Sequence, residues 1–236
     1  MHIHMPKALH DWRDFLKEVG IIVLGVLIAL SLEQMVEAWH WHEKVNASQA
    51  AIRRELLWDD GPQIYQRAAM HRCVAASLDA IRAAVESGKS RQDVSRAIDG
   101  YWMEVTTFDS LAHDAANTSD VATHMSPAQL ELFNTPYYII PLMERTNREE
   151  VADLPRLRAL RRTGGPLSEA ESSQLLLAVE TLRSEDQTMW LASVWIMPSL
   201  HALGGELDPA RTQDFMTRAK DHYGSCVRNL PPNFPT

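Results

Sequence analysis

The sequence predicts an all-α protein in which one N-terminal transmembrane helix continues into a soluble multi-helix bundle. Three observations support this fold class. Fourteen uncharged and almost wholly apolar residues run from Val19 to Leu32. Apolar residues further along the chain recur at spacings of three and four, which is the period of an amphipathic helix. No segment alternates convincingly between apolar and polar residues, so no sheet is predicted.

The apolar run is short for a membrane span. At about 1.5 Å per residue it is roughly 21 Å long, whereas the hydrocarbon core of a bilayer is about 30 Å thick. Flanking apolar residues extend it to 15–38, and tryptophans follow where an aromatic belt would lie. We therefore expect a retained membrane helix rather than a globular core helix or a cleaved signal peptide. The residues expected to anchor it are Val19, Ile21, Ile22, Val23, Leu24, Val26, Leu27, Ile28, Leu30, Leu32, Trp39 and Trp41.

The same helix carries small residues on its surface, namely Gly20, Gly25 and Ala29. Gly25 and Ala29 are four positions apart, the spacing that lets two helix backbones approach closely in lipid. We therefore expect the helix to contact other membrane proteins or a second copy of itself, in addition to the lipid bilayer.

The orientation of the helix is predicted from the basic residues near its ends. Lys7, Arg13 and Lys17 precede it, whereas Lys44 is the one Lys or Arg within the twenty residues after Leu32. Cytoplasmic flanks of membrane helices carry an excess of Lys and Arg. This bias favours an N-terminus in the cytoplasm and a C-terminal domain on the other side of the membrane.

The chain is expected to divide into five parts. These are a cytoplasmic tail (1–14), the transmembrane helix (15–38), a juxtamembrane helix (39–60), an α-helical extracytoplasmic domain (61–230) and a flexible tail (231–236). Asp59, Asp60 and Gly61 are expected to end the juxtamembrane helix, because glycine commonly terminates helices.

Local signals place the helices of the domain. Capping residues followed by proline begin three of them, and Ser168 with Glu171 forms a capping box that begins a fourth. The expected ranges are Pro62 to Ser87, Arg91 to Val105, a short helix from Pro127, another from Pro136, Ser168 to about Gly205 and Pro209 to about Asn229. The first carries the apolar stripe Met70, Val74, Leu78, Ile81 and Val85.

From Gln187 to Gly205 the chain has nineteen residues without Asp, Glu, Lys or Arg. A second membrane span is one interpretation. The preceding half of the same helix is charged and amphipathic, and Pro198 and His201 interrupt the run, so we favour the buried central helix of the domain.

Composition and motifs argue against several functional classes. The net charge of −8 argues against nucleic acid as a partner, since that binding depends on clustered Lys and Arg. Ser110, His113 and Asp114 lie close in sequence, with Asp109 and His124 nearby, but catalytic triads combine residues distant in sequence. We interpret this cluster as helix-capping residues. No enzymatic activity, metal site or cofactor is predicted.

Four arginines crowd one short segment, at Arg156, Arg158, Arg161 and Arg162. Such clusters usually form the solvated face of an amphipathic helix. The alternative is a patch that contacts anionic lipid headgroups or an acidic partner.

Cys73 and Cys226 are the two cysteines of the chain. In an oxidising compartment they are candidates for a disulfide, provided that the helices at Pro62–Ser87 and Pro209–Asn229 pack together. Two buried free thiols are the alternative.

The segment FLKEVGIIVLGVLIALSLEQ (Phe15–Gln34), with the helix that continues to Leu56, resembles uncharacterised bacterial single-pass membrane proteins with an N-terminal EVxIIVLGVLIAL-type anchor. The resemblance implies a bacterial inner-membrane location with a helical periplasmic domain, and no activity. The sequence thus favours a membrane-anchored structural or protein-interaction subunit. The alternative is an extracytoplasmic sensor or small-ligand-binding module with a pocket near Tyr137–Met143 and Trp190–Trp195.

Overall fold

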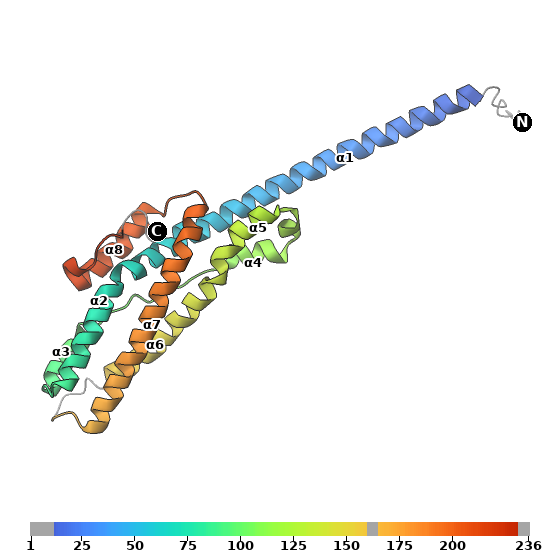
Figure 1. Ribbon diagram of the computed structural model, residues 1–236. Helices are drawn as coiled ribbons and strands as arrows, with labels where there is room; N and C mark the ends of the chain where they lie inside the picture. Colours follow the sequence, from blue (N-terminus) through green and yellow to red (C-terminus); the bar gives the residue numbers. More distant parts are fainter. Residues whose placement is uncertain (1–11, 160–164, 231–236) are drawn as a thin grey trace, which may run out of the picture. The chain divides into compact units, whose positions relative to one another are not determined.

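The computed structural model describes residues 12–159 and 165–230 (Figure 1). All regular secondary structure in these ranges is helical, which confirms the all-α prediction. The chain forms two compact units, Met1–Ala47 and Ser48–Thr236. The second unit therefore begins within the segment expected to be a juxtamembrane helix, because Ile52, Leu56 and Leu57 are already buried in its core. Residues 1–11 of the expected N-terminal tail (1–14) and the whole of the expected C-terminal tail (231–236) lie outside the described residues, and α1 begins at Trp12, within the expected tail.

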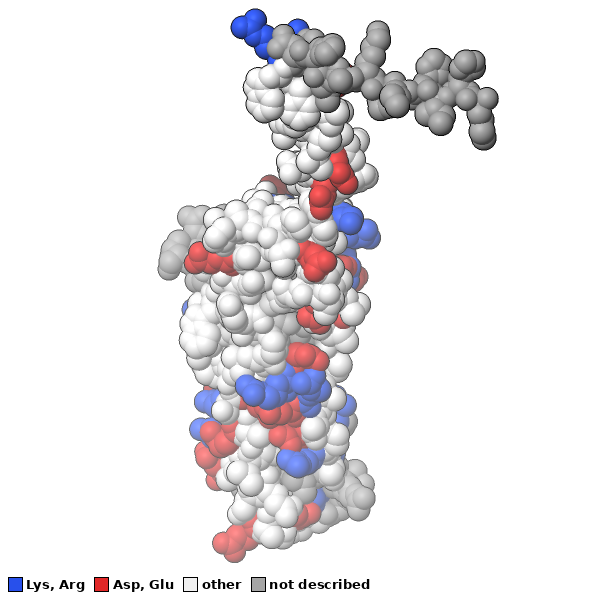
Figure 2. Space-filling model, turned by 90° about the vertical axis from the view of Figure 1, so that its right-hand side faces the viewer, with Lys and Arg blue, Asp and Glu red and all other residues white. Residues whose placement is uncertain are grey.

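The long N-terminal helix α1 spans Trp12–Arg54, 43 residues. Its most apolar window of 18 residues has a mean hydropathy of 2.3, and none of that window is buried. From Val19 to Leu32 the helix carries no charged residue and its large side chains are apolar and exposed, which leaves an uncharged stretch between charged flanks (Figure 2).

Gly61 does not end the helix, contrary to the prediction. The π-helical turn η1 (Glu55–Asp60) follows α1 directly, and Gly61 has right-handed helical angles (φ −54°, ψ −45°) that lead into α2 (Gly61–Glu86). A Cβ at this position would lie 2.4 Å from Leu207 Cδ2 and 2.8 Å from the carbonyl oxygen of Leu56. Glycine is therefore required here for close packing and not for a turn.

Three helices of the second unit, α2, α6 and α7, run side by side, and α3 and α8 pack against α2 (Figure 1). The remaining elements are α3 (Arg91–Asp99), α4 (Leu111–Thr118), η2 (Asp120–His124), α5 (Pro127–Asn134), η3 (Thr135–Tyr138), α6 (Ile140–Ala159), α7 (Glu169–Ala202), α8 (Pro209–Tyr223) and η4 (Gly224–Cys226).

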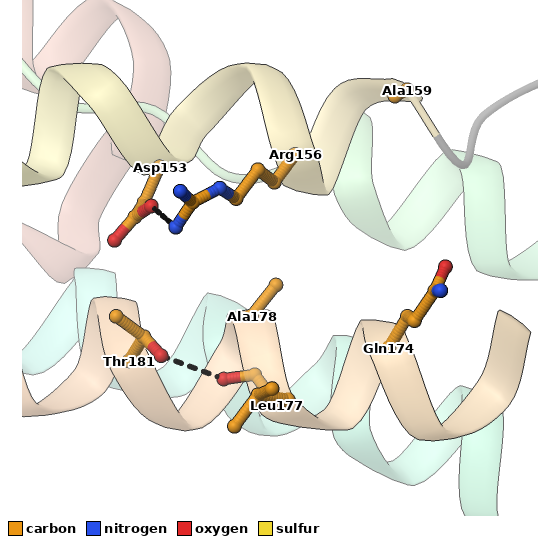
Figure 3. Close-up of a pocket in the computed structure, with 7 residues that line it drawn as sticks. All are labelled: Asp153, Arg156, Ala159, Gln174, Leu177, Ala178 and Thr181. Atoms are coloured by element: carbon orange, nitrogen blue, oxygen red, sulfur yellow. Dashed lines mark hydrogen bonds and ion pairs between the residues drawn. The ribbon is translucent and has the colours of Figure 1, made fainter. Parts of the chain in front are cut away.

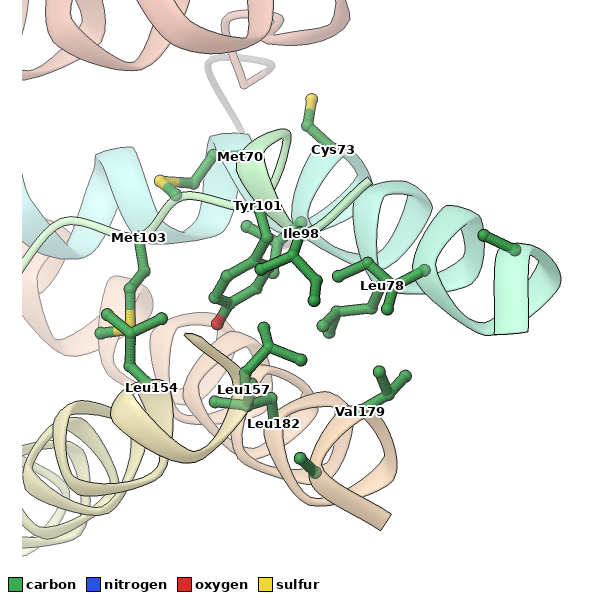
Figure 4. Close-up of a cluster of buried hydrophobic side chains, with 14 of the residues drawn as sticks. Met70, Cys73, Leu78, Ile98, Tyr101, Met103, Leu154, Leu157, Val179 and Leu182 are labelled. Carbon is green, nitrogen blue, oxygen red and sulfur yellow. The ribbon is translucent and has the colours of Figure 1, made fainter. Parts of the chain in front are cut away.

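Two hydrophobic clusters form the core of this unit. The first lies between α2, α3, α6, α7 and α8, and it contains the predicted stripe of α2, every residue of which is buried. Figure 4 shows Tyr101 reaching from the segment after α3 into the space between the helices, next to Ile98, Leu157 and Leu182. The second cluster joins η1, η3 and the start of α6 to the C-terminal half of α7.

The helix starts follow the predicted caps. Ser168 accepts a hydrogen bond from the backbone N–H of Glu171, and the Glu171 side chain accepts one from the backbone N–H of Ser168, which is the predicted capping box. Ser126 and Gln129 form a second capping box at α5, and Asp208 caps α8.

Two helices end earlier than predicted. Helix α3 stops at Asp99, and both the N–H and the C=O of Trp102 pair with the Tyr223 hydroxyl, at 2.9 and 2.6 Å. This side chain replaces the hydrogen bonds that a continued helix would supply. Helix α8 stops at Tyr223, because Gly224 has φ 59°, outside the range of a right-handed helix.

The uncharged stretch in α7 is a core element and not a second membrane span. Met189, Ala192, Ile196 and Leu200 are at most 1% exposed, and all belong to the second hydrophobic cluster. The prediction of a buried central helix is confirmed.

Candidate functional site

Most of the large hydrophobic side chains that are exposed in the described residues lie on α1. The large side chains from Val19 to Leu32 are 38% to 71% exposed. The Ser31 hydroxyl donates to the carbonyl oxygen of Leu27 at 2.7 Å, so this polar group is satisfied within the helix. Within the described ranges this is the one helix long and apolar enough to cross a membrane, by length and composition.

The residues expected to mediate helix packing, and the tryptophans expected at the membrane interface, lie on the surface of α1. A Cβ added at Gly20 or Gly25 would meet no atom within 4 Å, so close approach by another backbone is open at both positions. Trp39 is 67% exposed, and the Lys44 amino group lies 4.4 Å from the ring centroid of Trp41.

A disulfide joins Cys73 of α2 to Cys226 of η4. The two Cα atoms are 5.8 Å apart, and the bridge spans 153 positions of sequence. Cys73 is buried, whereas Cys226 is exposed. The bridge therefore ties the C-terminal segment to the central helix of the unit.

The four predicted arginines are only partly described. Arg156 and Arg158 occupy the last turn of α6, while Arg161 and Arg162 lie outside the described residues. Arg156 is ion-paired with Asp153 one turn before it, so part of its charge is neutralised within the helix.

The structure shows a set of buried charged residues between α2, α6 and α7 that the sequence analysis did not single out. Arg67 Nη2 donates to both carboxylate oxygens of Glu150 at 2.5 Å, and these side chains are 1% and 0% exposed. Burial alone would lower the pKa of Arg67, but nearby groups, first Glu150 and then Asp186, more than offset this, so the pKa is raised. A second pair, His71 Nδ1 to Asp186 Oδ2 at 2.7 Å, joins α2 to α7.

Beside these pairs lies a carboxyl pair. Burial, together with the charges of Asp153, Glu150 and Glu149 of α6, raises the pKa of Glu185 of α7 to about 8. Glu185 is therefore mostly protonated at neutral pH. Glu185 is 9% exposed, and its Oε2 is buried without a hydrogen-bond partner in the described residues.

A groove of about 450 Å³ opens between α6 and α7, with Asp153 in its wall. Figure 3 shows the linked side chains of Asp153 and Arg156 on one side and Ala178 pointing from α7 toward α6. We call it the α6/α7 groove; it is lined by Asp153, Arg156, Ala159, Gln174, Leu177, Ala178 and Thr181. No residue of the pocket proposed from sequence, near Tyr137–Met143 and Trp190–Trp195, lines this groove.

A second polar group surrounds η1. Tyr137 donates from its hydroxyl to Glu55 Oε1 at 2.5 Å, and Glu55 Oε2 accepts the backbone N–H of Ala112 at 2.7 Å. Burial raises the pKa of Asp60 to about 8, although the carboxyl accepts the backbone N–H of Asp109. These contacts hold helix α4 and the segment just before it, which contains Asp109, against η1.

Ser110, His113 and Asp114 do not form a nucleophile with its base. The Ser110 hydroxyl donates to Asp114 Oδ2 at 3.0 Å, while His113 Nε2 lies 3.0 Å from Asn134 Oδ1 and its ring stacks on Tyr137. A hydroxyl is activated by a hydrogen bond to the base itself, and here the serine contacts the carboxylate instead. Ser110 occupies the N-cap position of α4, but its side chain caps no backbone N–H.

The sequence did contain one signal for the buried charges. Arg67 precedes Met70 by three positions and so continues the apolar stripe of α2, and Glu185 falls between Leu182 and Met189 on the stripe of α7. An ionisable residue on an apolar stripe marks a buried charge that needs a partner. In the described residues, no group of three or more His, Cys, Asp or Glu is arranged to hold a metal ion.

Comparison with known proteins found no matching family model, no matching curated protein and no matching solved structure.

Proposed function

We propose that the protein is a single-pass subunit of the bacterial inner membrane, with its helical domain in the periplasm, and that it works by docking to other proteins. The observation that carries the proposal is the exposed apolar surface of α1. Burying apolar surface stabilises by roughly 25 cal/mol per Å², so a helix covered with exposed leucine, isoleucine and valine favours lipid over water. The length expected of the span, 15–38, fits a bilayer.

The disulfide supports the periplasmic location. Structural disulfides persist in oxidising compartments, such as the bacterial periplasm, and are rare in the cytosol. The bridge joins Cys73 and Cys226 in the second unit, which is the part proposed to lie outside the cytoplasm. The distribution of Lys and Arg around the apolar helix favours the same side.

Docking is the activity that these features support best. Exposed apolar side chains remain on the helical unit itself, among them Tyr138 at 80% and Trp195 at 58% exposure. Aromatic residues are enriched where proteins bind one another. The lipid bilayer is the first partner, and membrane proteins that contact α1 or the helical unit are the second.

Two measurements test the proposal. In carbonate-washed membranes, the chain should stay in the pellet, and the variant Leu24→Lys/Leu27→Lys should move to the soluble fraction because charge at the bilayer centre is costly. A photo-crosslinking residue at Trp195 should capture a membrane or periplasmic protein. The same residue at Glu180, which is exposed and paired with Arg82, is the control. Release of the parent chain by carbonate would contradict the anchor, and equal capture at both positions would contradict docking through Trp195.

The α6/α7 groove favours a second candidate function, a small-ligand-binding module. It requires no change in the proposed topology.

A further inference from the structure

We propose that the bridge between Cys73 and Cys226 is an exchange site for a thiol–disulfide oxidoreductase, and that the sulfur of this partner bonds to Cys226 and not to Cys73. Two observations carry the inference. The two cysteines differ sharply in exposure, and contacts on both sides of Cys226 hold it beside α2 without the bond. The class of partner rests on the proposed periplasmic location, where such enzymes form and exchange disulfides, whereas the choice of Cys226 rests on the structure alone.

The two cysteines are not equally open to another protein. Cys73 lies in the middle of α2, is 2% exposed and belongs to the first hydrophobic cluster. Cys226 is exposed and lies in the short turn η4, after the end of α8. Thiol–disulfide exchange begins when a thiolate reaches one sulfur of the bridge, so access decides which sulfur is attacked. In the folded chain this selects Cys226.

The segment that carries Cys226 is held in place by contacts other than the bridge. Before it, the Tyr223 hydroxyl pairs with the backbone N–H and C=O of Trp102, at 2.9 and 2.6 Å. After it, the Tyr65 hydroxyl pairs with the backbone N–H and C=O of Leu230, at 2.9 and 3.4 Å. Cys226 therefore lies between two points of attachment, each made by a tyrosine hydroxyl.

The second attachment is to the helix that carries the other cysteine. Tyr65 and Cys73 both belong to α2, about two turns apart. Val227, the residue after Cys226, is 4% exposed and lies in the same hydrophobic cluster as Cys73. The Cα atoms of the two cysteines are 5.8 Å apart, within the usual range for a disulfide. Noncovalent contacts thus position both sulfurs, and the dithiol form should keep this segment on α2.

The exchange balances in two steps. A thiolate of the partner attacks Cys226 Sγ and forms a mixed disulfide, and Cys73 Sγ leaves as a thiolate that takes up a proton. A second thiolate of the partner then attacks its own sulfur in the mixed disulfide, and Cys226 Sγ leaves and is protonated. The chain gains two electrons and two protons, and the dithiol of the partner becomes a disulfide. The reverse sequence forms the bridge.

The first test compares two chains that each keep one cysteine, in nanodiscs. Cys73→Ala leaves Cys226, and Cys226→Ser leaves Cys73, so both lack the bridge. The probe is a purified oxidoreductase whose resolving cysteine is replaced by alanine and whose remaining active-site cysteine carries a thionitrobenzoate group. Attack by the thiolate of the chain releases the coloured thionitrobenzoate and leaves a mixed disulfide that neither protein can resolve. We expect Cys73→Ala to react roughly tenfold faster or more, because only its thiol is exposed.

The fold is the source of this selectivity, so it should vanish when the chain is unfolded. In concentrated urea the two chains should react at similar rates. A thermal scan in the absence of urea shows that both are folded.

The oxidised parent gives a second reading that needs no variant to fold. It is reacted briefly with the reduced form of the same alanine-substituted oxidoreductase, and acid then stops exchange by protonating the thiolates. Peptide maps made without reductant should place the mixed disulfide on Cys226.

A third measurement tests the positioning of the sulfurs. Tyr65→Phe removes the hydroxyl that holds Leu230 and should slow bridge closure in the reduced parent by the intact, oxidised enzyme. Tyr138→Phe, at an exposed tyrosine, is the control and should leave the rate unchanged.

The proposal is overturned if the partner maps to Cys73, if it forms no mixed disulfide with the parent, or if the two folded single-cysteine chains react equally fast. Unchanged closure in Tyr65→Phe would overturn the positioning role. These rates are measured on purified protein and do not depend on the side of the membrane. Their failure can therefore be distinguished from failure of the proposed periplasmic location, which protease treatment of spheroplasts tests.

Discussion

The Nη2 atom of Arg67 lies 2.5 Å from both carboxylate oxygens of Glu150, and both residues are buried between helices α2 and α6. The pair links positions 83 apart in the sequence. A second contact, between His71 and Asp186, joins α2 to α7. Such pairs contribute less to net stability than to the choice of one helix register, since unpaired charges in any other register would be costly.

Arg67→Met should strongly destabilise the helical unit. The substitution leaves the Glu150 carboxylate buried without its partner, which typically costs about 3–5 kcal/mol. Equilibrium unfolding by urea measures the change in the free energy of unfolding. The double variant Arg67→Met/Glu150→Leu removes both charges and should recover most of the loss. If the single and double variants were equally unstable, the ion pair would not be the cause.

The stability of the unit should fall as pH rises from about 5 to about 8. The pKa of Glu185 is about 8 in the folded chain, against 4.5 for an ordinary glutamate, so the folded state holds a proton that the unfolded state has lost. Asp60 acts in the same direction. The stabilisation is complete below about pH 4.5 and is lost as pH passes through the folded pKa.

Glu185→Gln isolates this effect. The variant should reduce the decrease in urea midpoint between about pH 5 and about pH 8.5, and Asp60 should account for part of what remains. Glu180→Gln is the control, because Glu180 is exposed and paired with Arg82. A pH dependence that is the same in the parent and in Glu185→Gln would show that Glu185 does not carry the proton.

Removal of the disulfide should lower the free energy of unfolding. A loop closed over 153 positions stabilises by about 4–5 kcal/mol in the chain-entropy model, which counts the freedom lost by the unfolded chain. Cys73→Ser/Cys226→Ser should therefore shift the urea midpoint downward, and reductant should shift the parent by a similar amount without affecting the variant. Thiol counting on denatured, unreduced protein should find no free thiol; two per chain would rule out the bridge.

Association through α1 should depend on its small residues. Gly25→Leu/Ala29→Leu places bulk where two backbones would meet and should weaken any dimer or partner complex. Val26→Leu, which changes size little on the same helix, is the control. Crosslinking in native membranes measures the associated fraction. Equal crosslinking of all three chains would mean that this surface does not mediate association.

Sequence patterns predicted the helices well where residues close together in the sequence decide the local structure. The stripe from Met70 to Val85, the capping box at Ser168 and the Asp208 cap all occur as expected. Each depends on residues within a few turns of one another, which is the range that periodicity and capping rules describe.

Most of the failures involve contacts between residues distant in the sequence. Gly61 lies inside a continuous helix, where Leu207 occupies the space that a Cβ would need, and α3 ends where Tyr223 binds the backbone of Trp102. The α6/α7 groove and its carboxyl pair likewise combine two helices. A local pattern shows that Glu185 lies on an apolar stripe, but not that Asp153 is its partner.

The most direct test of the proposed function is the side of the membrane on which the helical unit lies. Protease added to spheroplasts that express the chain with a C-terminal epitope should remove the epitope and leave a short membrane-bound N-terminal fragment. A cytoplasmic protein must stay intact and a known periplasmic domain must be digested in the same samples. Retention of the full-length chain and its epitope, with both controls as stated, would contradict a periplasmic domain anchored by residues 15–38.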